Sequence, residues 1–264
     1  MSRQDRLNSI LELVIASGSI EVEEIAKTLN VSAATIRRDF DTLAKKQLLT
    51  RTHGGAVATG SSLGLPLSYR VAKDDEVKQR IAEVAAKMVS RYQIIGINGG
   101  TTTTEVARAI VARSEFAPNP NDGTEPALTV VTNAVNIAAE LTVRTQIKIV
   151  VTGGVARPRS YELIGPYAEE ILKEVNIDIA FLGVEAIDPV TGVSTHHEDE
   201  ARINRAMAAR AEKIVVVTDS SKFSKRAFAC IRPANEIDVL ITDSGIDSTI
   251  ADQLRQLGVE IIIA

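Results

Sequence analysis

The sequence predicts a multi-domain protein in which a small winged helix-turn-helix domain, residues 1–58, precedes a larger α/β domain with a mostly parallel sheet, residues 74–264. Three helical patterns followed by a short hairpin predict the first domain. Apolar β runs that alternate with helical segments predict the second. Between them, residues 59–73 are rich in Gly, Ser and Pro at their start, which is typical of a linker.

The composition narrows the class of protein. Of the 264 residues, 45% are hydrophobic and 24% charged, which is ordinary for a globular chain. A net charge of −4 means that any nucleic-acid contact comes from a local basic patch. Aromatic residues make up 3%, too few for a platform that stacks single-stranded bases. The single cysteine, Cys230, excludes an internal disulfide and, lying in an apolar run, is expected to be buried.

The sequence shows no pattern typical of a signal peptide or a membrane span. The first residues lack the apolar core of a signal peptide, and no apolar run approaches the ~20 residues of a membrane span. We therefore expect a cytoplasmic protein with no membrane partner.

Apolar spacing predicts the first two helices. Apolar residues from Leu7 to Val14 recur on one helical face, and Gly18 ends that helix. A shorter helix starts at about Glu21 and closes at Asn30, a residue that tolerates the left-handed conformation at a helix end.

The third helix is predicted over about residues 33–46. Ser32 precedes it as an N-cap, because its hydroxyl can accept a backbone N–H of the first turn. Ile36, Phe40 and Leu43 form its buried stripe. Residues 48–51 then predict a strand, His53-Gly54-Gly55 a turn, and residues 56–58 a returning strand, which completes a winged-helix layout.

The exposed face of the third helix favours DNA contact. Small residues and two arginines lie opposite the buried stripe, so the helix can approach the major groove while arginine bonds guanine or phosphate. Arg37 and Arg38 are expected to divide those two tasks, in either assignment. Arg51 and His53 are expected to reach the DNA backbone or minor groove from the hairpin.

This N-terminal pattern resembles the DeoR family of bacterial repressors. The resemblance rests on Val31-Ser32, Thr35-Ile36-Arg37-Arg38-Asp39, Leu43, Leu49, Arg51 and His53-Gly54-Gly55-Ala56. It implies that Ser32, Thr35 and the two arginines face DNA and that His53-Gly54-Gly55 forms the wing. Gln47 stands where many members have Gly. The predicted DNA-binding residues are Ser32, Ala33, Thr35, Arg37, Arg38, Arg51, His53, Gly54 and Gly55.

The second domain opens with a predicted amphipathic helix containing Val77, Ile81 and Val84. Seven runs rich in Ile and Val predict strands buried on both faces, as in a parallel sheet. A turn-rich loop over residues 114–126 is expected to be exposed. The strand runs are 94–97, 128–131, 147–151, 179–183, 214–217, 239–242 and 259–263.

Polar, glycine-rich turns follow four of these strands. In an open α/β sheet, ligands bind at the carboxyl ends of the strands, so these turns are expected to converge. The first precedes a helix, whose free N–H groups favour an anion such as phosphate. None is a GxGxxG or P-loop motif, so we expect no dinucleotide, ATP or other cofactor. The turns are 98–103, 132–133, 152–154 with Arg157, and 219–222.

The second domain is similar to the DeoR sensor domain, which is related to ribose-5-phosphate isomerases. The resemblance rests on segments that include Gly100-Thr101-Thr102, Gly153-Gly154, Phe181 to Gly183 and Asp219 to Lys222. It implies a phosphorylated sugar or polyol as effector. The predicted effector-binding residues are Asn98, Gly99, Gly100, Thr101, Thr102, Thr103, Asn133, Gly153, Gly154, Arg157, Asp178, Glu200 and Lys222.

Two departures from that family pattern bear on function. Asn98 stands where many members have Asp, and Asn204 where many have Lys, so the groups that isomerase-like chemistry would use are replaced. The run from His196 to Glu200 consists of residue types that can bind a metal. Consecutive residues point in different directions, however, so we expect the start of a helix instead. No metal site is predicted.

Two functions are consistent with these features. The first is a repressor of a sugar or polyol operon, not an enzyme, that binds double-stranded operator DNA and is released by a phosphorylated sugar or polyol. A homodimer or homotetramer is expected, since such repressors read paired half-sites. The alternative is an isomerase-like enzyme with an appended DNA-binding domain, which gives no role to Arg37, Arg38 or the wing.

Overall fold

A computed structural model describes residues 3–45, 48–58, 76–118, 123–158 and 160–264. The chain divides into two compact units, residues 1–73 and 74–264, which we describe separately. The linker predicted for residues 59–73, together with Lys46 and Gln47, lies outside the described residues.

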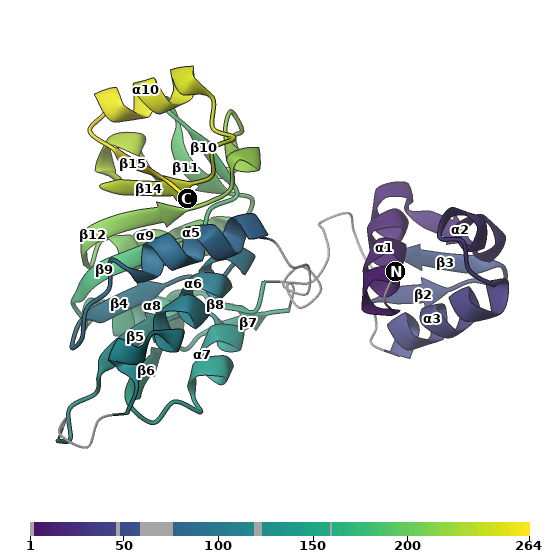
Figure 1. The fold of residues 1–264 in the computed structure, drawn as a ribbon, viewed down its shortest axis with the longest axis horizontal. Helices are drawn as coiled ribbons and strands as arrows, with labels where there is room; N and C mark the ends of the chain where they lie inside the picture. Colours follow the sequence, from purple (N-terminus) through teal and green to yellow (C-terminus); the bar gives the residue numbers. More distant parts are fainter. Residues whose placement is uncertain (1–2, 46–47, 59–75, 119–122, 159) are drawn as a thin grey trace. The chain divides into compact units, whose positions relative to one another are not determined.

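The described residues of the first unit form three helices and a small antiparallel sheet (Figure 1). The helices are α1 (Arg3–Ser17), α2 (Val22–Thr28) and α3 (Ala33–Lys45); the strands are β1 (Ser19–Glu21), β2 (Leu49–Arg51) and β3 (Gly55–Ala58). The predicted hairpin is confirmed as β2 and β3. Sequence reasoning missed β1, which pairs with β3 and makes β3 the central strand.

The core of this unit lies between the three helices and the sheet. The predicted apolar stripes are buried: Leu7, Ile10, Leu11 and Val14 of α1 pack with Ile36, Phe40 and Leu43 of α3. Asn30 has φ 51°, as expected at the end of α2. These contacts fix α3 with its other face in solvent.

The second unit is a seven-stranded sheet in the order β15-β14-β12-β9-β4-β5-β6, and all of its pairings are parallel. Each predicted strand run is confirmed with small changes of boundary. The strands are β4 (Ile94–Ile97), β5 (Leu128–Thr132), β6 (Ile147–Val151), β9 (Ile177–Leu182), β12 (Ala211–Val217), β14 (Val239–Thr242) and β15 (Glu260–Ile263).

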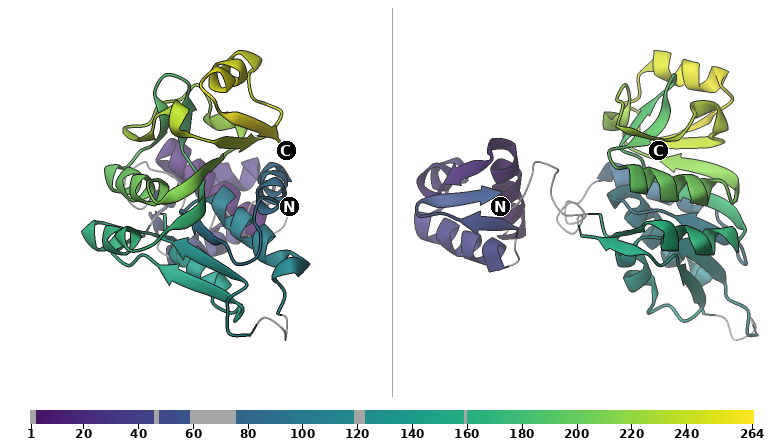
Figure 2. Two further views of the ribbon diagram at one scale, coloured as in Figure 1. Left: turned by 90° about the vertical axis from the view of Figure 1, so that its left-hand side faces the viewer. Right: turned by 180° about the vertical axis from the view of Figure 1, so that it is seen from behind.

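Helices cover both faces of this sheet (Figure 2). On one face, α5 (Glu76–Ala86), α6 (Thr101–Ala112) and α7 (Val135–Leu141) form the largest apolar core with alternate strand residues. On the other face lie α8 (Pro166–Lys173), α9 (Glu198–Ala208) and α10 (Ser248–Gln256). Burial on both sides explains why the strands are continuous apolar runs.

Two small antiparallel elements were not predicted. One is the hairpin of β7 (Val155–Arg157) and β8 (Glu162–Ile164); the other is the sheet of β10 (Ala186–Asp188), β11 (Gly192–Thr195) and β13 (Ala229–Arg232). Short 3-10 turns complete the unit: η1 (Ser114–Phe116), η2 (Ser220–Lys222) and η3 (Ala234–Glu236). These short strands lack the continuous apolar runs that marked the strands of the main sheet.

Two expectations about burial were wrong. The loop over residues 114–126 is not exposed throughout, because Phe116 is fully buried in the main core, and residues 119–122 lie outside the described part. Cys230 is exposed rather than buried. On β13 successive side chains alternate, so Ile231 faces the core and Cys230 faces solvent.

Candidate nucleic-acid interface and effector site

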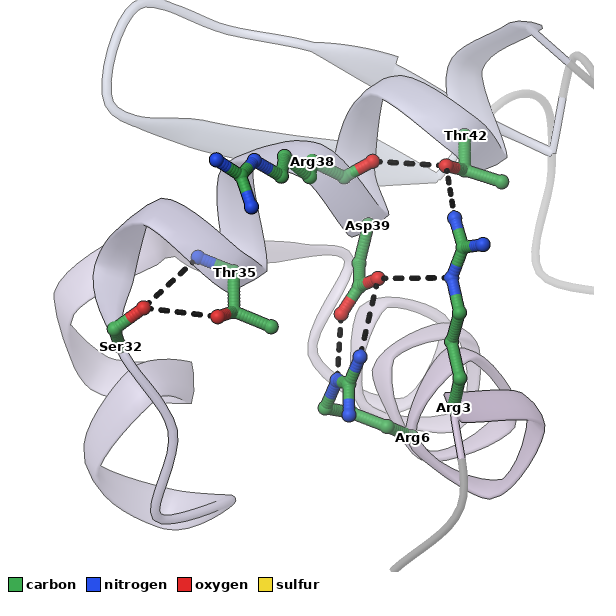
Figure 3. A network of polar contacts seen from close by, with 7 residues as sticks. All are labelled: Arg3, Arg6, Ser32, Thr35, Arg38, Asp39 and Thr42. Carbon is green, nitrogen blue, oxygen red and sulfur yellow. Dashed lines mark hydrogen bonds and ion pairs between the residues drawn. The ribbon is translucent and has the colours of Figure 1, made fainter.

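The start of α3 is capped as predicted. The backbone N–H of Thr35 donates to the Ser32 hydroxyl at 3.1 Å, and the two hydroxyls lie 2.8 Å apart (Figure 3). This cap satisfies one of the free N–H groups of the first turn. It also places two hydroxyls at the end of the helix that would enter a major groove.

The solvent face of α3 carries the predicted arginines. Arg37 and Arg38 are exposed, and Arg37 forms an exposed ion pair of 3.2 Å with Glu23 of α2. Ala33 is half-buried against the core, so it contributes less surface than predicted. Exposed pairs contribute about 0–1 kcal/mol, so Arg37 can exchange Glu23 for phosphate at little cost.

A buried ion pair that sequence reasoning missed joins α3 to α1. Asp39 is 2% exposed, and its Oδ2 accepts from Nε of Arg6 at 2.6 Å, while Arg3 approaches at 3.9 Å (Figure 3). The hydrogen bond to Asp39 raises the pKa of Arg6 against the opposing effect of burial. Asp39 lies next to Arg38, so this contact fixes the helix that presents both arginines.

The wing is the β2–β3 hairpin, and three of its predicted surface residues, Arg51, His53 and Gly54, are exposed. His53 and Gly54 face solvent, and Arg51 pairs with Asp41 of α3 at 2.5 Å. Gly55 is buried, so the prediction that it lies at the DNA surface is not supported. It belongs to the β1–β3 pairing and supports the wing from within.

Replacing Gly55 by alanine is expected to destabilise this domain by about 1–3 kcal/mol. A Cβ there would lie 2.0 Å from the backbone oxygen of Ile20, which β1 cannot move without losing its pairing. Gly54→Ala is the matched control, because its Cβ meets only the flexible end of the Glu21 side chain, at 2.7 Å. Urea unfolding of both variants checks the difference. Equal stabilities would contradict this account of the wing.

In the second unit, Asn98 at the end of β4 is engaged with backbone. Its amide donates to the carbonyl of Gly183 at 2.9 Å, and its Oδ1 accepts from the N–H of Gly183 at 2.8 Å. An aspartate could accept the second bond but could not donate the first. Asn98 therefore ties the ends of β4 and β9 together through one N–H of its amide and through its Oδ1.

The turn after β4 leads into α6 with Gly100 as N-cap, and no side chain caps the helix. The hydroxyls of Thr103 and Thr104 bond the carbonyl of Gly100, and the Thr102 side chain is buried. Of the predicted threonines, Thr103 therefore already donates its hydroxyl hydrogen within the turn. The N–H groups of the first helical turn remain available to a ligand.

The turn after β5 lies against the β7–β8 hairpin. Nδ2 of Asn133 donates to Glu162 Oε1 at 3.3 Å, and the N–H of Gly99 donates to the same oxygen at 3.2 Å. Asn133 and Glu162 are buried, and Oδ1 of Asn133 has no hydrogen-bond partner among the described residues. Glu162 thus joins the predicted turns of β4 and β5.

Glu162 was missed by sequence reasoning, and it is paired with Glu200 of α9. The two carboxyl groups share a hydrogen bond. Burial, the charge of Glu200 and that bond raise the pKa of Glu162 to about 8. Glu200 also accepts hydrogen bonds from Arg157 and from the Thr195 hydroxyl. Burial alone would raise the pKa of Glu200, but these contacts outweigh it and lower that pKa. The pair therefore holds one proton near neutral pH.

Asp178 and Lys222, two of the predicted effector residues, lie away from the turns after β4 and β5. Asp178 is near the start of β9, where its carboxylate accepts from the N–H of Ile94 at 2.7 Å. That is the amino end of the sheet, opposite the turns, so Asp178 does not belong to this site. Lys222 follows β12, which β9 separates from β4 in the strand order. Gly154 allows close packing, since a Cβ would lie 2.6 Å from the oxygen of Ile164.

The remaining predictions gather at the carboxyl edge of β4, β5 and β6. Gly99 and Asn133 bond Glu162, Glu162 is paired with Glu200, and Glu200 forms an ion pair with Arg157. Gly153 follows β6 with φ 74°. The run from His196 to Glu200 is the start of α9, as expected. Among the described residues, no group of three metal-ligating side chains comes together.

Comparison with known proteins agrees with both halves of this description. Residues 6–62 match the model of the DeoR-like helix-turn-helix domain, and residues 73–244 match that of the DeoR C-terminal sensor domain. The chain belongs to the DeoR family.

Relatives of this DeoR-family protein span nearly its whole length. It is 36% identical to the HTH-type transcriptional regulator GlpR of Haloferax volcanii, over 98% of this chain and 96% of that protein. It is 32% identical to the glycerol-3-phosphate regulon repressor of Escherichia coli K12, over 92% of each. These relatives are named regulators and repressors rather than enzymes, and this DeoR-family protein is a DNA-binding transcription regulator.

Solved structures include distant likenesses. Ribose 5-phosphate isomerase A from Neisseria gonorrhoeae has 20% identity and a TM-score of 0.41, covering 58% of this chain and 56% of that one. Within the described part of the chain, none of the helices has the length and apolar character to cross a bilayer.

Proposed function

We propose that this DeoR-family regulator represses an operon of sugar or polyol metabolism and leaves its operator when a phosphorylated sugar or polyol binds the second unit. The observation that carries the proposal is the uncapped start of α6, beside the buried polar cluster of Asn133 and Glu162. Its amides suit a phosphate, and the cluster suits a polar carbon skeleton. The name of the Escherichia coli relative, a glycerol-3-phosphate regulon repressor, supports this ligand class.

On the DNA side, we propose that α3 enters the major groove with Ser32, Thr35, Arg37 and Arg38, while the exposed wing residues contact the backbone. Support comes from the cap at Ser32 and from the exposure of both arginines. A dimer or tetramer would present two such helices to paired half-sites. No observation favours the isomerase alternative, and the relatives are named regulators.

Operator binding and release test this proposal together. Fluorescence anisotropy with DNA from the region upstream of the gene is expected to show a salt-sensitive complex. Glycerol 3-phosphate, ribose 5-phosphate and glucose 6-phosphate are then titrated in, and at least one should release the DNA. A ligand must bind the two states unequally to do so. The absence of any complex at low salt would reject the repressor.

Arg38→Ala is expected to weaken operator binding by about 1–3 kcal/mol, or roughly 5- to 150-fold, because a bidentate base or phosphate contact is lost. Arg80→Ala is the matched control: Arg80 is an exposed arginine of α5 in the other unit. A base contact would lower discrimination against altered operators, whereas a phosphate contact would lower the salt dependence. An unchanged affinity in the Arg38 variant would remove α3 from the interface.

A further inference from the structure

The anion-binding donors after β4 are not all free. The N–H of Gly99 is taken by Glu162 Oε1 at 3.2 Å, and a Cβ on Gly99 would lie 2.3 Å from Cγ of Glu162. The loop is therefore built around this carboxyl group. An anion at this edge is left with the amides that begin α6, a helix of 12 residues with no side-chain cap.

Beside those amides lies a group of buried acceptors. Glu162 is 4% exposed and Glu200 6%, and Glu162 also receives the amide of Asn133. The oxygen of that same amide, Asn133 Oδ1, is completely buried and has no partner among the described residues. A buried acceptor left without a donor is costly, and only a hydrogen-bond donor can satisfy it.

A phosphate cannot supply that donor, but a hydroxyl group can. Near neutral pH the carboxyl pair holds one proton, since the pKa of Glu162 is raised to about 8, and the remaining negative charge faces Arg157. The other groups that contact the pair, Gly99, Asn133, Ser160 and Thr195, are uncharged. The acceptor group can therefore stand next to an anion without strong repulsion.

We propose that Glu162, with Asn133 and Glu200, binds hydroxyl groups of the effector while the phosphate lies at the start of α6. The site then requires a ligand with an anion at one end and free hydroxyls close to it, such as a polyol phosphate, and rejects a simple alkyl phosphate. This inference rests on the proposed function and assigns Glu162 as the residue that determines specificity.

Matched ligands test the assignment by isothermal titration at pH 7 with the full chain. The probes are glycerol 3-phosphate, ribose 5-phosphate and glucose 6-phosphate, with propyl phosphate as the hydroxyl-free counterpart of the first. The wild type is expected to bind at least one polyol phosphate about tenfold or more tightly than propyl phosphate, because a site built for hydroxyls loses their hydrogen bonds.

Glu162→Met keeps the side-chain length but removes the acceptor, and it is expected to reduce the preference for polyol phosphate over propyl phosphate to near unity. Glu212→Gln, at an exposed position on β12, is the control and should keep the preference. Because the preference is a ratio within one variant, partial loss of folding does not change it. If Glu162→Met does not fold, Glu162→Gln takes its place. The ratio of the affinities for glycerol 3-phosphate and propyl phosphate is then compared between the wild type and Glu162→Gln, and the variant is expected to have the lower ratio.

Two results would overturn the assignment: a wild type that binds propyl phosphate as tightly as every polyol phosphate, or a Glu162 variant that keeps the full preference. Failure of all four probes to bind would also reject it, together with the proposed effector class. Operator binding is measured separately and does not depend on these ligands. Failure of the Glu162 assignment is therefore distinguishable from failure of the proposed repressor function.

Discussion

Replacing Arg6 by methionine is expected to destabilise the DNA-binding domain by about 3 kcal/mol and to abolish high-affinity operator binding. The change keeps the apolar stem but leaves the carboxylate of Asp39, which is 2% exposed, without its 2.6 Å partner. A buried charge that loses its partner cannot recover the hydration it gave up on folding. The α1–α3 contact is weakened where α3 carries Arg37 and Arg38.

Arg3→Met is the matched control on the same helix. Arg3 is 67% exposed and lies 3.9 Å from Asp39, so its removal is expected to cost less than about 1 kcal/mol. Urea unfolding and operator binding are measured for both variants. If Arg6→Met were as stable as Arg3→Met, the Arg6–Asp39 pair would not hold the recognition helix.

Asp39 also shows where sequence reasoning stops. The motif around Arg37 and Arg38 was recognisable, and the spacing of Ile36, Phe40 and Leu43 gave the correct buried face. Asp39 adjoins that face, but its partner is 33 positions away on α1. Local periodicity contains no information on such a pairing, so a buried carboxylate is indistinguishable from a solvated one until the helices are packed.

The same limit applies to the second unit. The strand runs and the helices between them were predictable because a sheet covered on both faces requires continuous apolar segments. The strands of the hairpin that carries Glu162, Val-Ala-Arg and Glu-Leu-Ile, lack the continuous apolar character of the sheet strands. Their sequence does not indicate that the Glu162 side chain is buried.

Individual site residues show a second limit of the sequence. Asn98 was predicted from the polar turn after its strand and Asp178 from the family resemblance, and both bond backbone groups that hold neighbouring strands together. A polar residue at a strand end can bind a ligand or hold neighbouring strands together. The same residue type at the same position is consistent with either role. Only the backbone partners, Gly183 and Ile94, distinguish the two.

The stability of the second unit is expected to fall as pH rises from about 5 to about 8, by up to roughly 5 kcal/mol, and Glu162→Gln should remove most of that fall. In the folded chain the pKa of Glu162 is raised from 4.5 to about 8 by burial and by Glu200. Between those values the native state keeps a proton that the unfolded chain has released. Stability is therefore complete below the unfolded pKa and is lost as pH rises through the folded one.

The contribution of Glu200 to stability changes with pH in the opposite direction to that of Glu162. The free energy of unfolding plotted against pH therefore has a maximum. The pKa of Glu200 is lowered, despite burial, by Arg157 and the hydroxyl groups around it, so its contribution is present above its ordinary pKa and lost as pH falls. The wild type is expected to be most stable near pH 5. The measurement is urea unfolding of the full chain at pH values from 4 to 9, following the transition of the second unit.

Comparison with Glu162→Gln isolates the carboxyl pair, because every other ionisable group is the same in both proteins and its contribution cancels in the difference. Glu212→Gln, an exposed carboxylate of the same unit, should leave the profile unchanged. Parallel profiles for the wild type and Glu162→Gln would mean that the pair holds no proton of its own at neutral pH. The acceptor group would then carry two negative charges beside the start of α6, and a phosphate there would be opposed rather than tolerated.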